Sequence, residues 1–208
     1  MIPLDTLAAF FLASVLLALS PGPDNIFVLT QSALYGKLAG ISVTMGLCTG
    51  LIVHTLAVTF GVAVIFQTSA MAFAALKICG AGYLLYLAWQ AFRASAAPID
   101  AVHNGGRDFL KLYRRGIVMN ITNPKVSVFF LAFLPQFADP ARGHLALQLI
   151  GFGGTFIVAT ILVFGAVAFL AGSIREWFYR SNKTQIILNR IAATVFVALA
   201  VNLVFMKQ

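Results

Sequence analysis

Six long apolar segments follow one another along the chain, separated by short groups of polar, glycine and proline residues. A helix needs about 20 mostly apolar residues to cross the hydrocarbon core of a bilayer, so each segment is long enough for one span. The predicted spans are 4–33, 38–66, 70–92, 115–137, 145–172 and 186–206. The pattern therefore predicts an all-α membrane protein in which six transmembrane helices form a single transport domain, residues 1–208.

The first and the fourth segment are each interrupted by a proline motif. The first motif reads Ser20-Pro21-Gly22-Pro23-Asp24-Asn25, and the second reads Asn120-Ile121-Thr122-Asn123-Pro124-Lys125. The bilayer core holds no water that could hydrogen-bond to freed backbone groups, so a broken helix is tolerated there only where protein or a polar cavity supplies partners. Two breaks at corresponding places in the two halves of a chain indicate the binding site of a transporter.

The long polar connection, about 93–115, separates three segments from three. Because each half has an odd number of spans, the second half is expected to be inverted in the membrane relative to the first. The halves, about 1–95 and 116–208, are nearly equal in length, and GLCTGLIVHT at 46–55 is echoed by GFGGTFIVAT at 151–160. We therefore expect two inverted three-helix repeats, with helices 1 and 4 broken at their proline motifs.

Composition and charge agree with a membrane protein and predict its orientation. The chain is 61% hydrophobic and only 10% charged, which excludes an ordinary soluble domain. The net charge of +8 would suggest a nucleic-acid partner in a soluble protein. Here, however, ten basic residues lie in the connections after spans one, three and five: Lys37, Arg93, Arg107, Lys111, Arg114, Arg115, Arg175, Arg180, Lys183 and Arg190. The opposite side holds only two or three.

The positive-inside rule then predicts that the 93–115 connection is cytoplasmic and that both termini lie outside, in contact with the periplasm. The expected partners are the lipid bilayer and a transported solute, with no nucleic acid. Before its break, the first segment carries only one charged side chain, Asp5, and lacks the basic start of a signal peptide. We expect it to be retained as a span.

Asp24 and Lys125 are the two charged residues deepest in apolar sequence. An ionisable side chain near the membrane midplane costs at least about 2.5–3.5 kcal/mol, so it indicates function by default. Each follows a proline, which favours the first turn of a helix, where the dipole attracts negative charge. Asp24 could therefore be a helix cap, and Lys125 could be an ion-pair partner of Asp24. The functional interpretation is that Lys125 binds a carboxylate, while Asp24 binds an ammonium group or a coupling proton.

Around these two charges, the predicted binding and coupling site comprises Asn25, Asn120, Asn123, Pro21, Gly22, Pro23, Pro124 and His54. The three asparagines add amide donors and acceptors, and the prolines and Gly22 form the breaks themselves. His54 lies in the middle of the second segment, among threonines. Since an imidazole titrates near physiological pH, His54 is interpreted either as a proton relay or as a hydrogen-bonded packing residue.

Other classes of site are disfavoured by spacing. The three histidines, His54, His103 and His144, are dispersed, whereas a metal exporter would need a cluster with carboxylates. Cys48 and Cys79 lie away from both breaks, whereas a membrane redox carrier would need a cysteine pair beside them. No catalytic residue, metal or cofactor is expected. An efflux protein or channel for other small metabolites or ions stays an open alternative.

Small residues also favour close helix packing. Gly36-x-x-x-Gly40 and Gly46-x-x-x-Gly50 allow helices to approach each other closely. Packing within one chain and packing in a homo-oligomer both explain these pairs.

At these residues the chain resembles the LysE/RhtB family of amino-acid exporters. The resemblance rests on the motif at 20–24, on GAGYLLYL at 80–87, and on the motif at 120–125 followed by FFL at 129–131 and LPQF at 134–137. The order and spacing suit the family from end to end. The resemblance implies a six-span protein of the bacterial inner membrane that exports amino acids or close derivatives, driven by the proton gradient. Nothing in the sequence selects one cargo.

Overall fold

The structure is a computed structural model that describes residues 2–68, 70–93, 108–180 and 182–205, with parts of four long helices described by their backbone alone. These residues form helices and short connections, with no strand among them. In chain order the elements are α1 (Leu4–Leu19), α2 (Pro23–Tyr35), α3 (Lys37–Thr68), α4 (Ala70–Arg93), α5 (Phe109–Ile121), α6 (Pro124–Val128), η1 (Phe129–Phe133), η2 (Leu134–Phe137), η3 (Pro140–Arg142), α7 (Leu145–Arg180) and α8 (Asn182–Phe205). The all-α prediction is confirmed for the described residues.

Two stretches of the described helices are long and apolar enough to cross a bilayer, 25 residues of α3 and 27 residues of α7. Two bent pairs qualify together: α1 with α2, at an angle of 63°, and α5 with the segment from Pro124 to Phe137, at 51°. The described residues thus offer two to four candidate spans. Helices α4 and α8 are 24 residues each and match the predicted third and sixth segments in extent. The predicted number of six spans remains a prediction.

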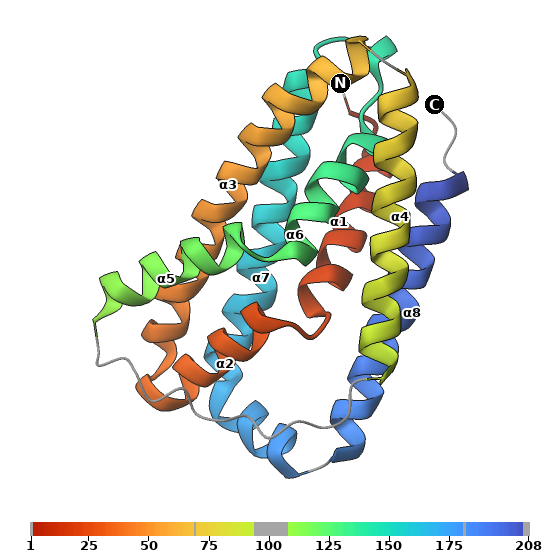
Figure 1. The fold of residues 1–208 in the computed structure, drawn as a ribbon. Helices are drawn as coiled ribbons and strands as arrows, with labels where there is room; N and C mark the ends of the chain where they lie inside the picture. Colours follow the sequence, from red (N-terminus) through yellow and green to blue (C-terminus); the bar gives the residue numbers. More distant parts are fainter. Residues whose placement is uncertain (1, 69, 94–107, 181, 206–208) are drawn as a thin grey trace.

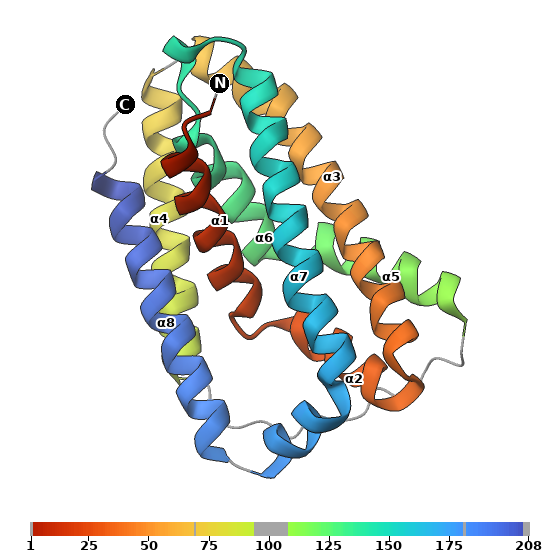
Figure 2. The ribbon, with the colours of Figure 1, turned by 180° about the vertical axis from the view of Figure 1, so that it is seen from behind.

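The long helices α3, α4, α7 and α8 run along the length of the molecule, α1 and α6 lie between them, and α5 crosses α3 and projects to one side (Figures 1 and 2). Helix α3 packs against α5 and α7, α4 packs against α8, and α1 packs against α7. The start of α1 and the end of α8 lie at the same end of the bundle, and the α2–α3 turn lies at the other (Figure 1). Both breaks therefore come to lie in the middle part of the bundle.

Proline chemistry explains where the broken helices stop and restart. Helix α1 ends at Leu19, just before Pro21, and α2 begins at Pro23. Helix α5 ends at Ile121, and α6 begins at Pro124. Proline has no N–H to continue a helix but suits the first helical position, where that N–H has no partner anyway. Both predicted interruptions are present.

The second broken segment carries a further irregularity after α6. The chain widens into a π-helical turn, η1, and then tightens into the 3₁₀ turn η2, which contains Pro135. Since Pro135 cannot donate to a carbonyl of the preceding turn, the local widening accommodates it. Phe129, Phe130 and Phe133 of η1 remain buried, and the rings of Phe129 and Phe133 pack at a tilt of 37° with centroids 4.8 Å apart.

Buried apolar side chains form two separate clusters. The first cluster is centred on Phe10 of α1, Phe129 of η1 and Phe152 of α7, and it extends to α4 and α8. The second cluster is centred on Val28 of α2, Val43 of α3 and further α7 side chains, and it extends to Leu112 of α5. The breaks lie between the two clusters, so the polar motifs occupy a gap in the apolar packing.

Glycines let α3 and α5 approach with their backbones almost in contact. A side chain on Gly46 would lie 2.1 Å from the carbonyl oxygen of Tyr113, and one on Gly116 would lie 2.5 Å from that of Val43. Gly40 is likewise closed in by Ser32 of α2. Of the glycines predicted to allow close packing, Gly40, Gly46 and Gly50 therefore do so within one chain. Gly36 has a different role, because its φ of 89° ends α2 in a conformation that favours glycine.

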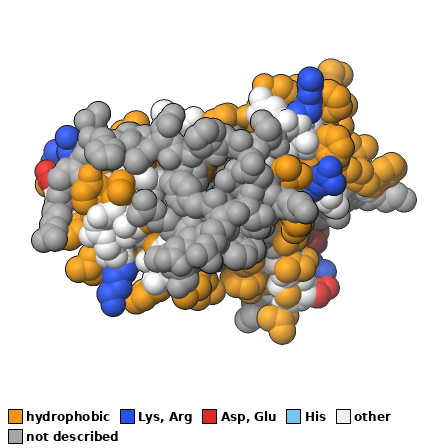
Figure 3. Space-filling model, turned by 90° about the horizontal axis from the view of Figure 1, so that it is seen from below, with side chains coloured by type: hydrophobic (Ala, Val, Ile, Leu, Met, Phe, Trp, Pro, Cys, Tyr) orange, Lys and Arg blue, Asp and Glu red, His pale blue; other side chains and the backbone are white. Residues whose placement is uncertain are grey.

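The end of the bundle with the α2–α3 turn carries basic side chains around its rim (Figure 3). Lys37 at the start of α3 and Arg93 at the end of α4 are exposed there. At the other end, exposed Arg142 of η3 forms an ion pair with Asp139 at 2.9 Å. Most of the predicted 93–115 connection, including Arg107 and His103, lies outside the described residues.

Candidate functional site

The two breaks are joined through Lys125, which reaches from the second break to the first. Its Nζ donates to the carbonyl oxygen of Ser20 at 3.0 Å and to that of Leu17 at 3.3 Å. These carbonyls belong to the end of α1, where the last turn of a helix has no internal donors. The Lys125 ammonium group, only 7% exposed, therefore satisfies backbone groups freed by the Pro21 break.

Another contact runs in the same direction, from the second break to the acid of the first. Asn123 donates from Nδ2 to Asp24 Oδ2 at 2.9 Å, while its Oδ1 accepts from the backbone N–H of Lys125 at 3.0 Å. Asn123 is thus the N-cap of α6 and the partner of a buried carboxylate. Within the first break, Asn25 Nδ2 donates to the carbonyl oxygen of Ala18 at 2.7 Å. The hydrogen bonds between the two breaks are thus all donated by the second motif.

These contacts differ from the two structural interpretations given above, in which Asp24 caps a helix and Lys125 forms an ion pair with Asp24. The N-cap of α2 is Gly22, without a side-chain bond, and Asp24 does not cap the helix. Asp24 and Lys125 are both described, yet they are not joined by an ion pair. The cap and the direct ion pair are therefore wrong as descriptions of the contacts. Both charges nevertheless line one cavity.

Gly22 and the prolines shape the site without bonding to it. A side chain on Gly22 would lie 3.0 Å from Lys125 Nζ, so this glycine leaves room for the lysine. Its φ of −174° is ordinary extended backbone, so space and not backbone conformation is the reason. Pro23 and Pro124 occupy the first position of α2 and α6, and Pro21 lies in the connection between α1 and α2.

Asn120 and His54 belong to the same region. His54 Nε2 lies 3.2 Å from the carbonyl oxygen of Asn120, near the end of α5, and its ring packs against Phe130 at 5.5 Å. Because a carbonyl oxygen only accepts, this contact requires a hydrogen on Nε2. His54 therefore supports the end of α5 much as Lys125 supports the end of α1. The Asn120 side chain lies across Gly50, where a side chain would come within 2.6 Å of Asn120 Oδ1.

A small cavity lies between the breaks and α7. Its lining is Leu17, Ala18, Asp24, Asn120, Lys125, Val126, Phe156, Thr160 and Phe164. It leaves about 10 Å³ for the centre of a water-sized sphere, which is the room of one water molecule. The lining draws on both apolar clusters. A larger solute can enter only if these walls move apart.

Thr160 is a lining residue that sequence reasoning missed. It is 2% exposed on α7, and its hydroxyl has no hydrogen-bond partner. The available signal was the echo between 46–55 and 151–160, which ends on a threonine in each copy. Among the predicted site residues, all lie at or next to the breaks except His54, which contacts the second break from α3.

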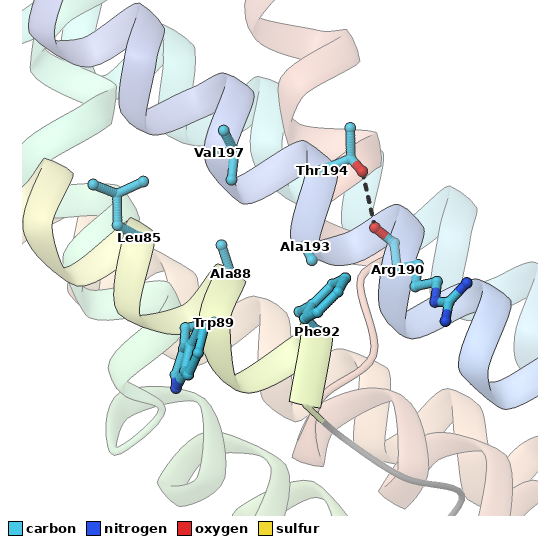
Figure 4. A pocket seen from close by; sticks show the side chains of 8 residues that line it. All are labelled: Leu85, Ala88, Trp89, Phe92, Arg190, Ala193, Thr194 and Val197. Atoms are coloured by element: carbon cyan, nitrogen blue, oxygen red, sulfur yellow. Dashed lines mark hydrogen bonds between the residues drawn. The ribbon is translucent and has the colours of Figure 1, made fainter.

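A larger groove lies elsewhere, between α4 and α8 (Figure 4). It measures about 670 Å³ and is open and mostly apolar, with Trp89 and Phe92 on one wall and Arg190 on the other. None of its lining residues belongs to the breaks, so it is not the candidate site. The part of the chain that the structure describes contains no cluster of His, Cys or acidic residues that could hold a metal.

Long apolar helices, two of them broken, that meet at a buried site with unlike charges define a membrane transporter. The family model of the LysE type translocator matches residues 15–207. The chain therefore belongs to the LysE type translocator family, whose members are transporters rather than enzymes. The resemblance seen in the motifs is confirmed.

Named relatives cover almost the whole chain. A homoserine/homoserine lactone efflux protein of Salmonella typhimurium is 37% identical over 192 residues, which is 90% of each chain. An uncharacterized membrane protein of Vibrio cholerae is 31% identical over 189 residues, 90% of this chain and 91% of the relative. The uncharacterized membrane protein YrhP of Bacillus subtilis is 25% identical over 207 residues, 95% and 98%. No solved structure matches the chain.

Proposed function

We propose that this translocator exports amino acids or close derivatives across the bacterial inner membrane in exchange for protons. The observation that carries the proposal is the buried pair of breaks, joined by hydrogen bonds from Asn123 and Lys125, which brings Asp24 and Lys125 to one cavity. A zwitterionic cargo has one partner for each of these charges. The Salmonella relative, named as a homoserine/homoserine lactone efflux protein, supports the same class of cargo.

The proposed fold has six spans in two inverted halves. Two packing relations support it, because a twofold exchange of the halves would swap α1 with α5 and α3 with α7. The α1–α7 contact would then become the α5–α3 contact, and both are extensive. The pairs α3–α7 and α4–α8 would each map onto themselves, and both pack closely. Pro23 and Pro124 would be equivalent, since each begins a half-helix.

The proposed transport cycle opens one side of the site at a time. The cavity lies between the two apolar clusters, so each cluster separates it from one end of the bundle. Loosening the second cluster would admit cargo from the end with the basic rim, which we assign to the cytoplasm. Loosening the first cluster would release cargo to the outside. The backbone can bend at the two breaks, because the helices are already interrupted there.

Efflux from loaded proteoliposomes tests this function. Reconstituted protein should export labelled homoserine, faster when a pH gradient is imposed than without one. Asp24→Asn and Lys125→Met should each reduce export at least about tenfold, because each removes a buried charge in contact with the cargo site. Asp5→Asn and Lys111→Ala are matched controls on exposed positions and should export normally.

The outcomes separate the parts of the proposal. A monodisperse, inserted Asp24→Asn or Lys125→Met variant that exports normally would show that the site is wrong. If the export rate is the same with and without the pH gradient, only the proton-exchange part of the proposal is contradicted. A wild-type protein that moves unrelated metabolites as well as it moves amino acids would favour the alternative of an unspecific efflux protein.

A further inference from the structure

One buried threonine, Thr160, departs from the way that the other buried threonines of the described helices are used. Six helical threonines donate their hydroxyl to the carbonyl four residues earlier: Thr44, Thr49, Thr55, Thr59, Thr155 and Thr194. This local bond is the ordinary way to satisfy a hydroxyl in an apolar helix. Thr160 makes no such bond, although it lies on α7 only five positions after Thr155 and is more deeply buried. Its hydroxyl is left available to the cavity.

Asp24 offers a second unsatisfied oxygen to the same cavity. Its Oδ2 accepts from Asn123, but its Oδ1 is buried without a partner. Asp24 and Thr160 both line the cavity and are each only 2% exposed. A buried acceptor without a donor costs about 1–3 kcal/mol, and more when it is charged. Asn120, a third lining residue, likewise has an Oδ1 without a partner. Three such oxygen atoms around one small space indicate a ligand that brings several donors.

A primary ammonium group meets this requirement. It carries three N–H donors and a positive charge, so it can bond to the Asp24 carboxylate and the Thr160 hydroxyl together. A carboxylate cannot take this place, because Asp24 would repel it. The rings of Phe156 and Phe164 and the side chain of Val126 surround the polar groups and suit the aliphatic part of the cargo.

The carboxylate end of a cargo has a weaker partner. Lys125 already donates to two carbonyls of α1, which leaves one of its three N–H groups for a ligand. Homoserine and homoserine lactone, for which the Salmonella relative is named, share a primary ammonium group, but the lactone has no free carboxylate. The difference between these cargoes lies at the end that the cavity holds less firmly.

We propose that Thr160 and Asp24 together bind the primary ammonium group of the cargo, which makes Thr160 a specificity-determining residue. This assignment rests on the proposed export function. The site then selects primary amines and tolerates cargo with or without a free carboxylate. Modification of the amine nitrogen removes N–H donors, so N-acetylhomoserine lactone should not compete for the site.

Three variants of the full-length protein in proteoliposomes test the assignment, with homoserine and homoserine lactone as probes. Thr160→Val keeps the shape but removes the hydroxyl, and it should raise the apparent KM for both probes about tenfold, the loss expected for one hydrogen bond to a charged group. Thr160→Ser should stay within about threefold of wild type. Thr155→Val, on the same helix, loses only a local backbone bond and should leave KM unchanged.

A second measurement guards against a folding defect. Homoserine lactone should raise the melting temperature of wild-type protein and of Thr155→Val in detergent, but not that of Thr160→Val. If the wild-type protein exports both probes and Thr160→Val has the same KM as wild type, the assignment is overturned and the export function remains. Equal competition by N-acetylhomoserine lactone would overturn it as well. A wild-type protein that exports neither probe would overturn the export of these amines and the assignment together.

Discussion

Lys125 shows how a buried charge can be held without a direct ion pair. Placing an ammonium group in the membrane interior costs at least about 2.5–3.5 kcal/mol. Two hydrogen bonds from a charged donor contribute about 1.5–3 kcal/mol each, so the carbonyls of Leu17 and Ser20 can offset that cost. The end of α1 is also the negative end of a helix dipole. Asp24 thus keeps one carboxylate oxygen for a ligand.

Gly50 provides a sharp test at the residue scale. A side chain there would lie 2.6 Å from Asn120 Oδ1 and 2.7 Å from Asn120 Cβ, so Asn120 would have to move. Since Asn120 lines the cavity and its carbonyl binds His54, Gly50→Ala should reduce export at least about tenfold in inserted protein. The measurement is initial efflux rate per reconstituted molecule.

Gly61→Ala is the matched control for this substitution. It lies on the same helix, and a side chain there meets nothing within 4 Å. Its efflux rate should equal that of wild type. Equal loss in both variants would mean that α3 needs glycine for flexibility, and would contradict a steric role for Gly50.

At the scale of elements, the contact between α3 and α5 positions the second break. Gly46→Ala and Gly116→Ala each insert a methyl group against backbone, at 2.1 and 2.5 Å, and backbone cannot rotate away. Overpacking of this kind costs about 1–3 kcal/mol, which exceeds the roughly 1 kcal/mol that alanine gains over glycine in a helix. Both variants should therefore melt at a lower temperature in detergent than wild type.

The reference for this prediction is Gly154→Ala on α7, where a side chain would meet nothing within 4 Å. Its melting temperature should stay equal or rise slightly, because only the helix-propensity term remains. If Gly46→Ala and Gly116→Ala melt as this variant does, the close approach of α3 and α5 is not present in the protein in solution.

At the scale of the whole molecule, the distribution of basic residues predicts which end faces the cytoplasm. Lys37 and Arg142 are exposed at opposite ends of the bundle. In a Cys79→Ser background, which removes the exposed native thiol, a membrane-impermeant maleimide should label Arg142→Cys in intact cells. It should label Lys37→Cys only after the inner membrane is permeabilised. The reverse pattern would contradict the proposed orientation and leave the site unchanged.

Sequence reasoning predicted the candidate site in its residues but not in its contacts. Asp24 and Lys125 were expected together, and they do line one cavity. The partner of Lys125 could not be foreseen, because the carbonyls of α1 become neighbours only when the two halves pack. Thr160 was missed for the same reason, since a threonine in an apolar helix is ordinary until its hydroxyl is found without the usual local bond.

The sequence by itself determined the features that depend on short stretches of chain. Apolar length determined the helical segments, the missing N–H of proline determined where α1 and α5 end, and the motifs identified the family. Only the tertiary structure decided that Lys125 bonds to α1, that Asn123 holds Asp24, and that Thr160 faces them. The physical reason is that helix formation and interruption are local, whereas the partner of a buried polar group is chosen by packing between segments distant in the chain.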